Sequence, residues 1–398
     1  MAAPSSARFD QMLAPPMVFY VAKGPADACG RGCDSWIAAE GQIVGDTASR
    51  FRKFWQPLRD RNLPIYFSSP GGNLDQALVI GTMLREKPVV ARVARTVVSE
   101  CGFEAQTGEV CLTLKQSGRA LYADLSARGA MCNSACPYLI LGAATREIAP
   151  DVALGIHSPK VVLHWIGLGD VTQWMVEAAT DRARDRADRL VSTYLAKMDA
   201  DRRLLELART VKTEDMHMLT REELIRFGID RREFVETPWM FENDARSMVR
   251  KSAIQKNDLA KNGGGNSYRS VQWRLTCSSA DRFDLDFQRP AALVSAFDTV
   301  SISSDGPRHY FAFPPYRPMG FEVWRLRMGR ELAQSLADSP GFDFTETSLA
   351  GDGRRLAHSE KFSSEGLAGA LANLLATCPA PKDAPSLQAN RLHDSAVK

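Results

Sequence analysis

Short apolar runs alternate with segments of helical spacing through the first half of the chain, and this alternation is the strongest constraint on its fold. Four of the apolar runs are too short to be helices, so we expect them to be strands; they cover residues 17–22, 63–68, 89–94 and 152–157. Helical periodicity occupies 47–61 and 74–84, where large apolar side chains recur on one face. Strands that alternate with helices predict an α/β core with a largely parallel sheet.

The length and the changes in composition divide the chain further. At 398 residues it is long enough for two or three domains. A run rich in lysine, asparagine and glycine at 255–269 has the composition of a linker. After it, short strands precede helical stretches near 326–337 and 364–377. We therefore expect a flexible arm at 1–16, an α/β domain at 17–240, a linker at 241–269, a small α+β domain at 270–381 and a loose tail at 382–398.

The eight cysteines suggest a compartment. Six of them fall in close pairs and the other two are far apart; the four pairs are Cys29/Cys33, Cys101/Cys111, Cys132/Cys136 and Cys277/Cys378. An even number and clustered spacing favour disulfides and a periplasmic or secreted location, although no signal peptide is evident at the start of the sequence. Reduced cysteines in a cytosolic protein are the alternative. A zinc site is disfavoured because no second Cys/His pair stands at a familiar offset.

Charge and hydropathy exclude two classes of function. Fifty basic against 47 acidic side chains leave a net charge of +3, which argues against a general nucleic-acid binder. No run approaches the ~18 apolar residues that a membrane-spanning helix needs. Arg/Asp pairs at i,i+3 and i,i+4 spacing within 171–198 predict a long helix with a solvated face. No metal or organic cofactor is implied by any motif.

Three segments carry residues suited to catalysis. A strand runs into Ser69-Pro70-Gly71-Gly72 and then a helix, which directs backbone N–H groups toward a site for an oxyanion or phosphate. Ser134 stands among small residues between a strand end and a helix start, where its hydroxyl is presented and the next N–H faces the same site. His157 ends an apolar strand 23 residues later.

Each segment also has a structural interpretation. Pro-Gly-Gly is a common tight turn, Ser134 could be the N-cap of a helix over 135–141, and His157 could be a hydrogen-bonded core residue. Cys132 or Cys136 could be the nucleophile in a reduced protein, or the two could bond to each other or to Cys101 and Cys111. The Gly-x-Ser-x-Gly elbow is missing, so an α/β-hydrolase is disfavoured.

In this order and spacing, the three segments resemble the Clp-type serine peptidases of the Clp/crotonase superfamily. A predicted helix after Thr220, with a capping box to Glu223, leads to Gly228-Ile229-Asp230 and resembles that family's closing segment. The resemblance covers about 17–240, and the paired cysteines around the serine look most like predicted periplasmic Clp-like proteins of bacteria. It implies a Clp/crotonase-like domain of repeated strand–helix units and a tendency to form homo-oligomers.

Carried over to this sequence, the resemblance implies a serine hydrolase that acts on peptides through an acyl-enzyme. Ser134 would be the nucleophile and His157 the general base, and Gly71 or Gly72 would form the oxyanion hole with the Ala135 N–H. The family's acid position falls on Met216, so the neighbouring Asp215 is the carboxylate expected to orient the histidine. The alternatives are a catalytically inactive Clp-like scaffold or binding protein of the cell envelope, and a crotonase-type acyl-CoA enzyme.

Overall fold

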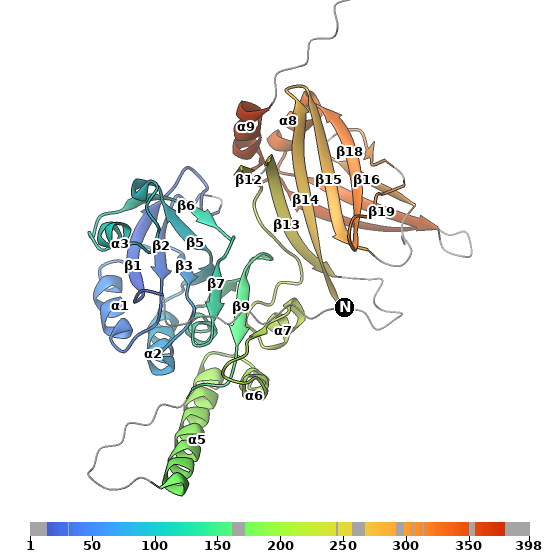
Figure 1. Ribbon diagram of the computed structural model, residues 1–398. Helices are drawn as coiled ribbons and strands as arrows, with labels where there is room; N and C mark the ends of the chain where they lie inside the picture. The colour runs from blue at the N-terminus through green and yellow to red at the C-terminus, as the bar shows by residue number, and fades with distance from the viewer. Residues whose placement is uncertain are drawn as a thin grey trace, which may run out of the picture. The chain divides into compact units, whose positions relative to one another are not determined.

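A computed structural model describes residues 14–30, 32–160, 172–243, 246–256, 267–291, 298–304, 306–312, 314–349 and 355–378. The protein forms two compact units (Figure 1). The first comprises Met1–Val235 with Ile254–Tyr268, and the second comprises Glu236–Ala253 with Arg269–Lys398. Most of the predicted arm and the whole predicted tail lie outside the described residues.

The first unit is built on a seven-stranded sheet of order β5-β6-β1-β2-β3-β4-β8. Strands β2, β3, β4 and β8 are mutually parallel, and β1 pairs antiparallel with β2. The mixed α/β prediction is therefore confirmed for this unit. The strands are β1 (Val18–Lys23), β2 (Ser35–Glu40), β3 (Ile65–Ser68), β4 (Val90–Val93), β5 (Arg95–Val98), β6 (Leu121–Ser126) and β8 (Thr145–Glu147).

The central strands are buried on both faces. In β2, Ile37 and Ala39 belong to one apolar cluster, and Trp36 and Ala38 belong to another, as the alternation of a strand requires. Such two-sided burial is typical of parallel sheets and explains why the apolar runs are continuous. The helices of this unit are α1 (Thr47–Trp55), α2 (Leu74–Arg85), α3 (Glu109–Lys115), α4 (Cys136–Ile140), α5 (Gln173–Lys197), α6 (Arg203–Thr210) and α7 (Arg221–Arg226).

A second, three-stranded sheet of order β10-β9-β7 positions the residues of interest. Strands β7 (Met131–Asn133) and β9 (Ala153–Ile156) are parallel, and β10 (His217–Met218) pairs antiparallel with β9. The long charged helix predicted at 171–198 is α5, whose buried residues lie only in its last two turns. No described helix is both long enough and apolar enough to cross a membrane.

The second unit consists of antiparallel strands and two helices, α8 (Arg330–Asp338) and α9 (Leu367–Thr377). One sheet contains β11 (Val235–Glu236), β12 (Met240–Asn243), β13 (Ser247–Lys256), β14 (Tyr268–Ser279), β15 (Arg282–Pro290) and β18 (Phe321–Gly329). The other contains β16 (Thr299–Ser303), β17 (His309–Tyr310), β19 (Gly341–Leu349) and β20 (Arg355–Ser363). Trp273 lies at the centre of the core, with the rings of Phe287, Phe342, Phe344 and Phe362 around it.

Two sequence-based assignments in this region are wrong. The predicted linker at 241–269 contains most of β12 and all of β13, while 257–266 lies outside the described residues. Strand β13 looks polar because of Lys251, which is fully buried but ion-paired to Glu236 at 3.0 Å and bonded to the Thr237 carbonyl. The helix expected near 326–337 begins only at Arg330, because β18 runs through Gly329.

Candidate active site

Ser134 occupies a sharp turn between β7 and α4. Its φ of 59° is left-handed, a conformation that costs a residue other than glycine about 1–2 kcal/mol. The turn is fixed by the Ser134 N–H, which donates to the Gly155 carbonyl on β9 at 2.8 Å. The N-cap of α4 is Ala135, and no side chain caps this helix, so the alternative of Ser134 as an N-cap is wrong. A half-buried hydroxyl held on a strained turn is a feature of functional sites.

A disulfide closes this turn from both sides. Cys132, in β7, is bonded to Cys136, the first residue of α4, and Ser134 lies midway between them. Both cysteines are fully buried. The other three pairs expected from spacing are bonded as well, so none of the eight cysteines is free to be a nucleophile or a metal ligand. Among the residues that the structure describes, no group of three or more His, Cys, Asp or Glu side chains could hold a metal ion.

Gly71 and Gly72 bring bare backbone against the serine turn. A Cβ on Gly71, whose φ is 100°, would lie 2.6 Å from the Ser134 Cβ and 3.0 Å from the Ala135 nitrogen. A Cβ on Gly72, whose φ is 132°, would lie 2.1 Å from the Ile43 carbonyl oxygen. Only glycine fits either position, because any larger residue would collide with backbone.

The two glycines differ in their N–H groups. The Gly71 N–H donates to the buried Ser69 hydroxyl at 3.1 Å, so it is already satisfied. The N–H groups of Gly72 and Ala135 donate to no acceptor among the described residues. Gly72 is exposed, so its N–H is open to solvent, whereas Ala135 is buried and directly follows Ser134. Backbone N–H groups without a protein acceptor are the donors that an oxyanion hole needs.

His157 follows β9, the strand that runs parallel to β7. The register pairs Asn133 with Gly155, so the residues that follow the two strands, Ser134 and His157 among them, emerge at the same edge of the sheet. The histidine is 7% exposed, and its Nδ1 lies 2.7 Å from the Ser158 carbonyl oxygen. A carbonyl can only accept, so Nδ1 carries the proton and Nε2 is the basic nitrogen. Nε2 is buried and has no hydrogen-bond partner among the described residues.

The Ser158 carbonyl is itself held in place by α6 and the loop after it. The Ser158 hydroxyl donates to the carbonyls of Ala208 and Arg209, each at 3.1 Å. Its N–H donates to the Val211 carbonyl at 3.0 Å, and the Thr213 hydroxyl donates to the Ser158 carbonyl at 3.3 Å. The acceptor that orients His157 is therefore anchored on several sides.

Asp215 does not take the role expected of it. Its side chain is exposed, no hydrogen bond joins it to His157 among the described contacts, and the Ser158 carbonyl occupies the partner position at Nδ1. Met216 lies inward instead: a Cβ on Gly155 would meet its Cγ and Sδ at 2.6 Å. Residues 215 and 216 thus present a thioether to the sheet and a carboxylate to solvent.

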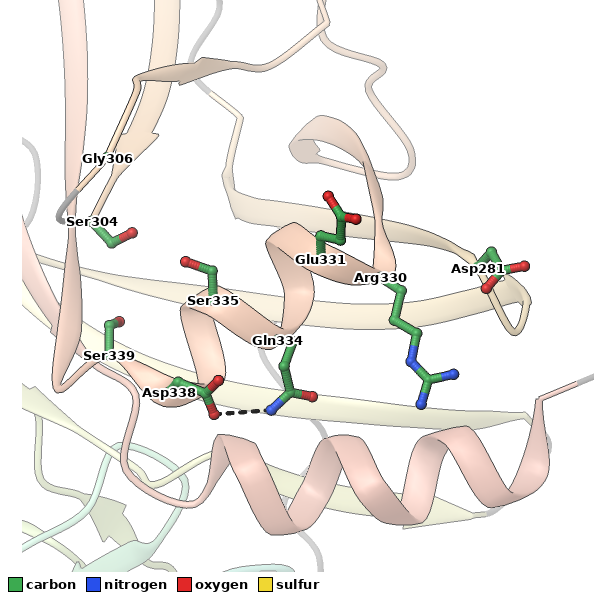
Figure 2. A pocket seen from close by; sticks show the side chains of 9 residues that line it. All are labelled: Asp281, Ser304, Gly306, Arg330, Glu331, Gln334, Ser335, Asp338 and Ser339. Carbon is green, nitrogen blue, oxygen red and sulfur yellow. Dashed lines mark hydrogen bonds between the residues drawn. The ribbon is translucent and has the colours of Figure 1, made fainter.

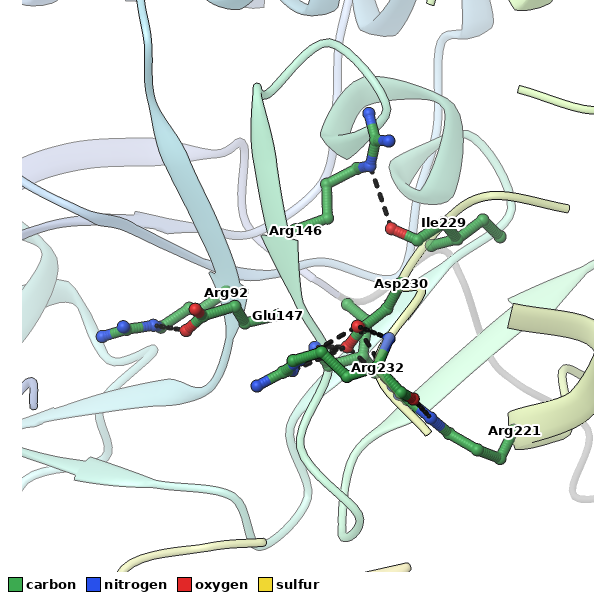
Figure 3. Close-up of polar contacts among 8 residues, drawn as sticks. Arg92, Arg146, Glu147, Arg221, Ile229, Asp230 and Arg232 are labelled. Atoms are coloured by element: carbon green, nitrogen blue, oxygen red, sulfur yellow. Dashed lines mark hydrogen bonds and ion pairs between the residues drawn. The ribbon is translucent and has the colours of Figure 1, made fainter. Parts of the chain in front are cut away.

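The closing segment is fixed by a buried ionic cluster (Figure 3). The Asp230 carboxylate accepts from Arg232 at 2.6 Å, from Arg221 at 3.0 Å and from the Ile148 N–H at 2.8 Å. Burial by itself would raise the pKa of Asp230, but these hydrogen bonds outweigh it and lower the pKa to about 2. The predicted capping box of Thr220 and Glu223 is present, and the backbone turns after α7 at Gly228, whose φ is 72°.

A separate groove of about 890 Å³ lies in the second unit beside α8 (Figure 2). Apart from Gly306, the residues that line it have polar or charged side chains, and Gln334 donates to Asp338 across one turn of α8 at 2.9 Å. None of the candidate catalytic residues lines this groove. Among the described contacts, no hydrogen bond joins Ser134 to His157, whose Nε2 has no partner.

Comparisons with known proteins give weak similarities only. No protein-family model matches the sequence, and no curated protein matches it. Among solved structures, the 1510-N membrane-bound stomatin-specific protease has a TM-score of 0.28 at 18% identity, covering 48% of this chain and 75% of that one. ClpP1 from Listeria monocytogenes has a TM-score of 0.28 at 17% identity, covering 48% and 85%.

A third structure, the invasion associated protein B from Bartonella henselae, has a TM-score of 0.27 at 14% identity and covers 35% of this chain and 92% of its own. At TM-scores of 0.27 and 0.28, none of these similarities carries an argument about fold or activity. The functional assignment therefore depends on the geometry of the serine turn itself.

Proposed function

We propose that the protein is a serine hydrolase that cleaves peptides through an acyl-enzyme on Ser134. The observation that carries the proposal is the left-handed turn at Ser134, which lies against the Gly71 backbone and is followed by the Ala135 N–H, a donor with no acceptor among the described residues. A strained, half-buried hydroxyl beside preorganised donors is the arrangement that acyl transfer requires.

The proposed reaction uses the tautomer of His157 that its surroundings favour. Nε2 takes the proton of the Ser134 hydroxyl as Oγ attacks the substrate carbonyl carbon. The N–H groups of Gly72 and Ala135 donate to the oxyanion that forms. When the C–N bond breaks, Nε2 returns the proton to the leaving amine, and water then hydrolyses the Ser134 ester.

The Ser158 carbonyl replaces a carboxylate as the partner of Nδ1. A carbonyl fixes the ring orientation and tautomer, but it carries no full charge to stabilise the imidazolium. Loss of the functional aspartate costs about 10⁴ in rate in well-studied triads. We therefore expect slow turnover and readier reaction with activated electrophiles than with peptides.

The four disulfides are consistent with an oxidising compartment, and we propose that the protein acts in the periplasm or outside the cell. Assembly into a homo-oligomer is also part of the proposal, as the resemblance to Clp-type peptidases implies. Sedimentation of the purified oxidised protein tests the assembly.

Labelling with a fluorophosphonate, read by intact mass, tests the activated serine. Wild type should gain one adduct, and Ser134→Ala and His157→Gln should each lose it. The matched control is Ser117→Ala, which removes an exposed hydroxyl remote in sequence from the site and should label like wild type. Unchanged labelling of Ser134→Ala would disprove the nucleophile. Absence of labelling in wild type would favour the alternative, a non-catalytic binding protein on the same scaffold.

A further inference from the structure

The side chain of Asn133 is buried next to the candidate nucleophile with its polar atoms unsatisfied. The residue is 1% exposed, and neither Nδ2 nor Oδ1 has a hydrogen-bond partner among the described residues. A buried amide left without partners is destabilising, and almost all such groups in native proteins are paired with protein or ordered water. The unsatisfied Asn133 amide therefore indicates that a polar molecule binds next to it.

The surroundings of Gly155 show where the Asn133 side chain lies. Asn133 ends β7 and is paired in register with Gly155 on β9. A Cβ on Gly155 would lie 2.8 Å from Asn133 Oδ1 and 2.6 Å from Met216 Cγ and Sδ. The amide therefore lies across the face of β9 at Gly155, in the space that a larger residue would fill.

A second unsatisfied polar atom comes from the same strand end. His157 is two residues beyond Gly155, and the alternation of an extended backbone places positions 155 and 157 on the same face. Its Nε2 is buried and has no partner among the described residues. An amide offers donors and an acceptor, and Nε2 offers an acceptor; a water molecule can bond to both kinds of group.

We propose that Asn133 is a positioning residue that holds a water molecule beside His157 Nε2, and that this water hydrolyses the acyl-enzyme. The inference rests on the proposed function. The Asn133 amide binds the water, which gives a proton to Nε2 as its oxygen forms a bond to the acyl carbon. The bond from that carbon to Ser134 Oγ then breaks, and Nε2 returns the proton to Oγ. The products are a carboxylic acid and free serine.

The first test is a high-resolution crystal structure of wild type and of Asn133→Leu, which keeps the size of the side chain and removes its hydrogen-bonding groups. We expect density for a water within hydrogen-bond distance of the Asn133 amide and His157 Nε2 in wild type and none in the variant. A wild-type structure with no such water overturns the proposal, whatever the activity.

The second test separates acylation from deacylation with an activated nitrophenyl ester, followed by stopped flow and intact mass. Asn133→Leu should keep the burst rate within about twofold and slow deacylation by about tenfold or more, so that the acyl-enzyme accumulates. Asn133→Ser has a hydroxyl that can still bind water, so its deacylation rate should lie between those of wild type and Asn133→Leu. This variant replaces Asn133→Leu in the test if the leucine variant does not fold.

The two proposals fail in different ways in the ester experiment. If wild type acylates and Asn133→Leu deacylates at the wild-type rate, the positioning role is wrong while the serine hydrolase proposal stands. If wild type forms no acyl-enzyme with the ester and none with a fluorophosphonate, the serine hydrolase proposal itself is wrong, and the hydrolytic role of the water fails with it.

Discussion

Two sets of buried polar groups in the first unit differ in how fully they are hydrogen-bonded. The Asp230 carboxylate is surrounded by donors from Arg221, Arg232 and the Ile148 N–H. At the serine turn, His157 Nε2 and the Asn133 amide are buried with no partner among the described residues. A fully hydrogen-bonded cluster stabilises the fold. Buried groups without partners lower the stability, and their donors and acceptors are available to a ligand. The contrast distinguishes the polar residues that stabilise the fold from those that we propose bind a ligand.

Removal of Asp230 should have the largest effect on stability. Asp230→Asn leaves the buried Arg221 without its counter-charge, and breaking a buried pair in this way costs about 3–5 kcal/mol. Urea unfolding followed by circular dichroism measures the loss. Asp199→Asn is the control, because it breaks an exposed pair with Arg231 and should change little. An equal effect of the two variants would contradict the structural role of the cluster.

The same cluster predicts a dependence on pH. The pKa of Asp230 is about 2 in the folded protein and its ordinary value is 3.8, so the carboxylate contributes stability above pH 3.8 and loses it as the pH falls through 2. The difference in unfolding free energy between wild type and Asp230→Asn should shrink by about 2 kcal/mol between pH 5 and pH 2. A difference that stays constant over this range would show that the pKa of Asp230 is not lowered in the folded state.

The disulfide around the serine should matter for both stability and reactivity. Replacing Cys132 and Cys136 by alanine removes a short cross-link, worth about 2 kcal/mol in the loop-entropy account, and frees the turn that presents Ser134. Fluorophosphonate labelling should slow in this variant. The matched control replaces Cys29 and Cys33, whose separation in sequence is also 4, and should lose similar stability with no change in labelling. Equal labelling rates in the two variants would show that the Cys132–Cys136 disulfide does not affect the reactivity of Ser134.

The smallest predicted effect has the opposite sign. Ser134→Gly relieves the left-handed backbone at this position and should raise the free energy of unfolding by about 1 kcal/mol, while Ser134→Ala keeps the strain. Both variants should lose fluorophosphonate labelling. Thermal unfolding of the two proteins measures the difference. A destabilised glycine variant would mean that the turn is not strained. The serine turn would then differ less from the stabilising Asp230 cluster.

The candidate site could be predicted from the sequence because its signals are local. Each signal is contained in a few consecutive residues. The signals are Pro-Gly-Gly after a strand, a serine among small residues, and a histidine at a strand end. Asn133 could also have been noticed, as an amide within an otherwise apolar strand end next to the candidate serine.

Other features depend on contacts that no local pattern reports. The partner of His157 is the backbone carbonyl of Ser158, which has no side-chain signature, and the outward position of Asp215 depends on the path of a loop. The linker composition at 255–269 does not show that the predicted boundary at 241 cuts through β13, where the buried Lys251 pairs with Glu236 on a different segment. In each case a tertiary contact overrides the local preference.

The carbonyl that orients His157 has a consequence for how this protein can vary. A carboxylate orienter is lost by a single codon change, whereas every amino acid at position 158 carries a backbone C=O. One of the bonds that set its direction joins the Ser158 N–H to the Val211 carbonyl and is independent of the side chain. The bonds to the Ala208 and Arg209 carbonyls come from the Ser158 hydroxyl, so position 158 should favour serine or threonine. Relatives could therefore differ at 215 and 216 while keeping the same imidazole geometry.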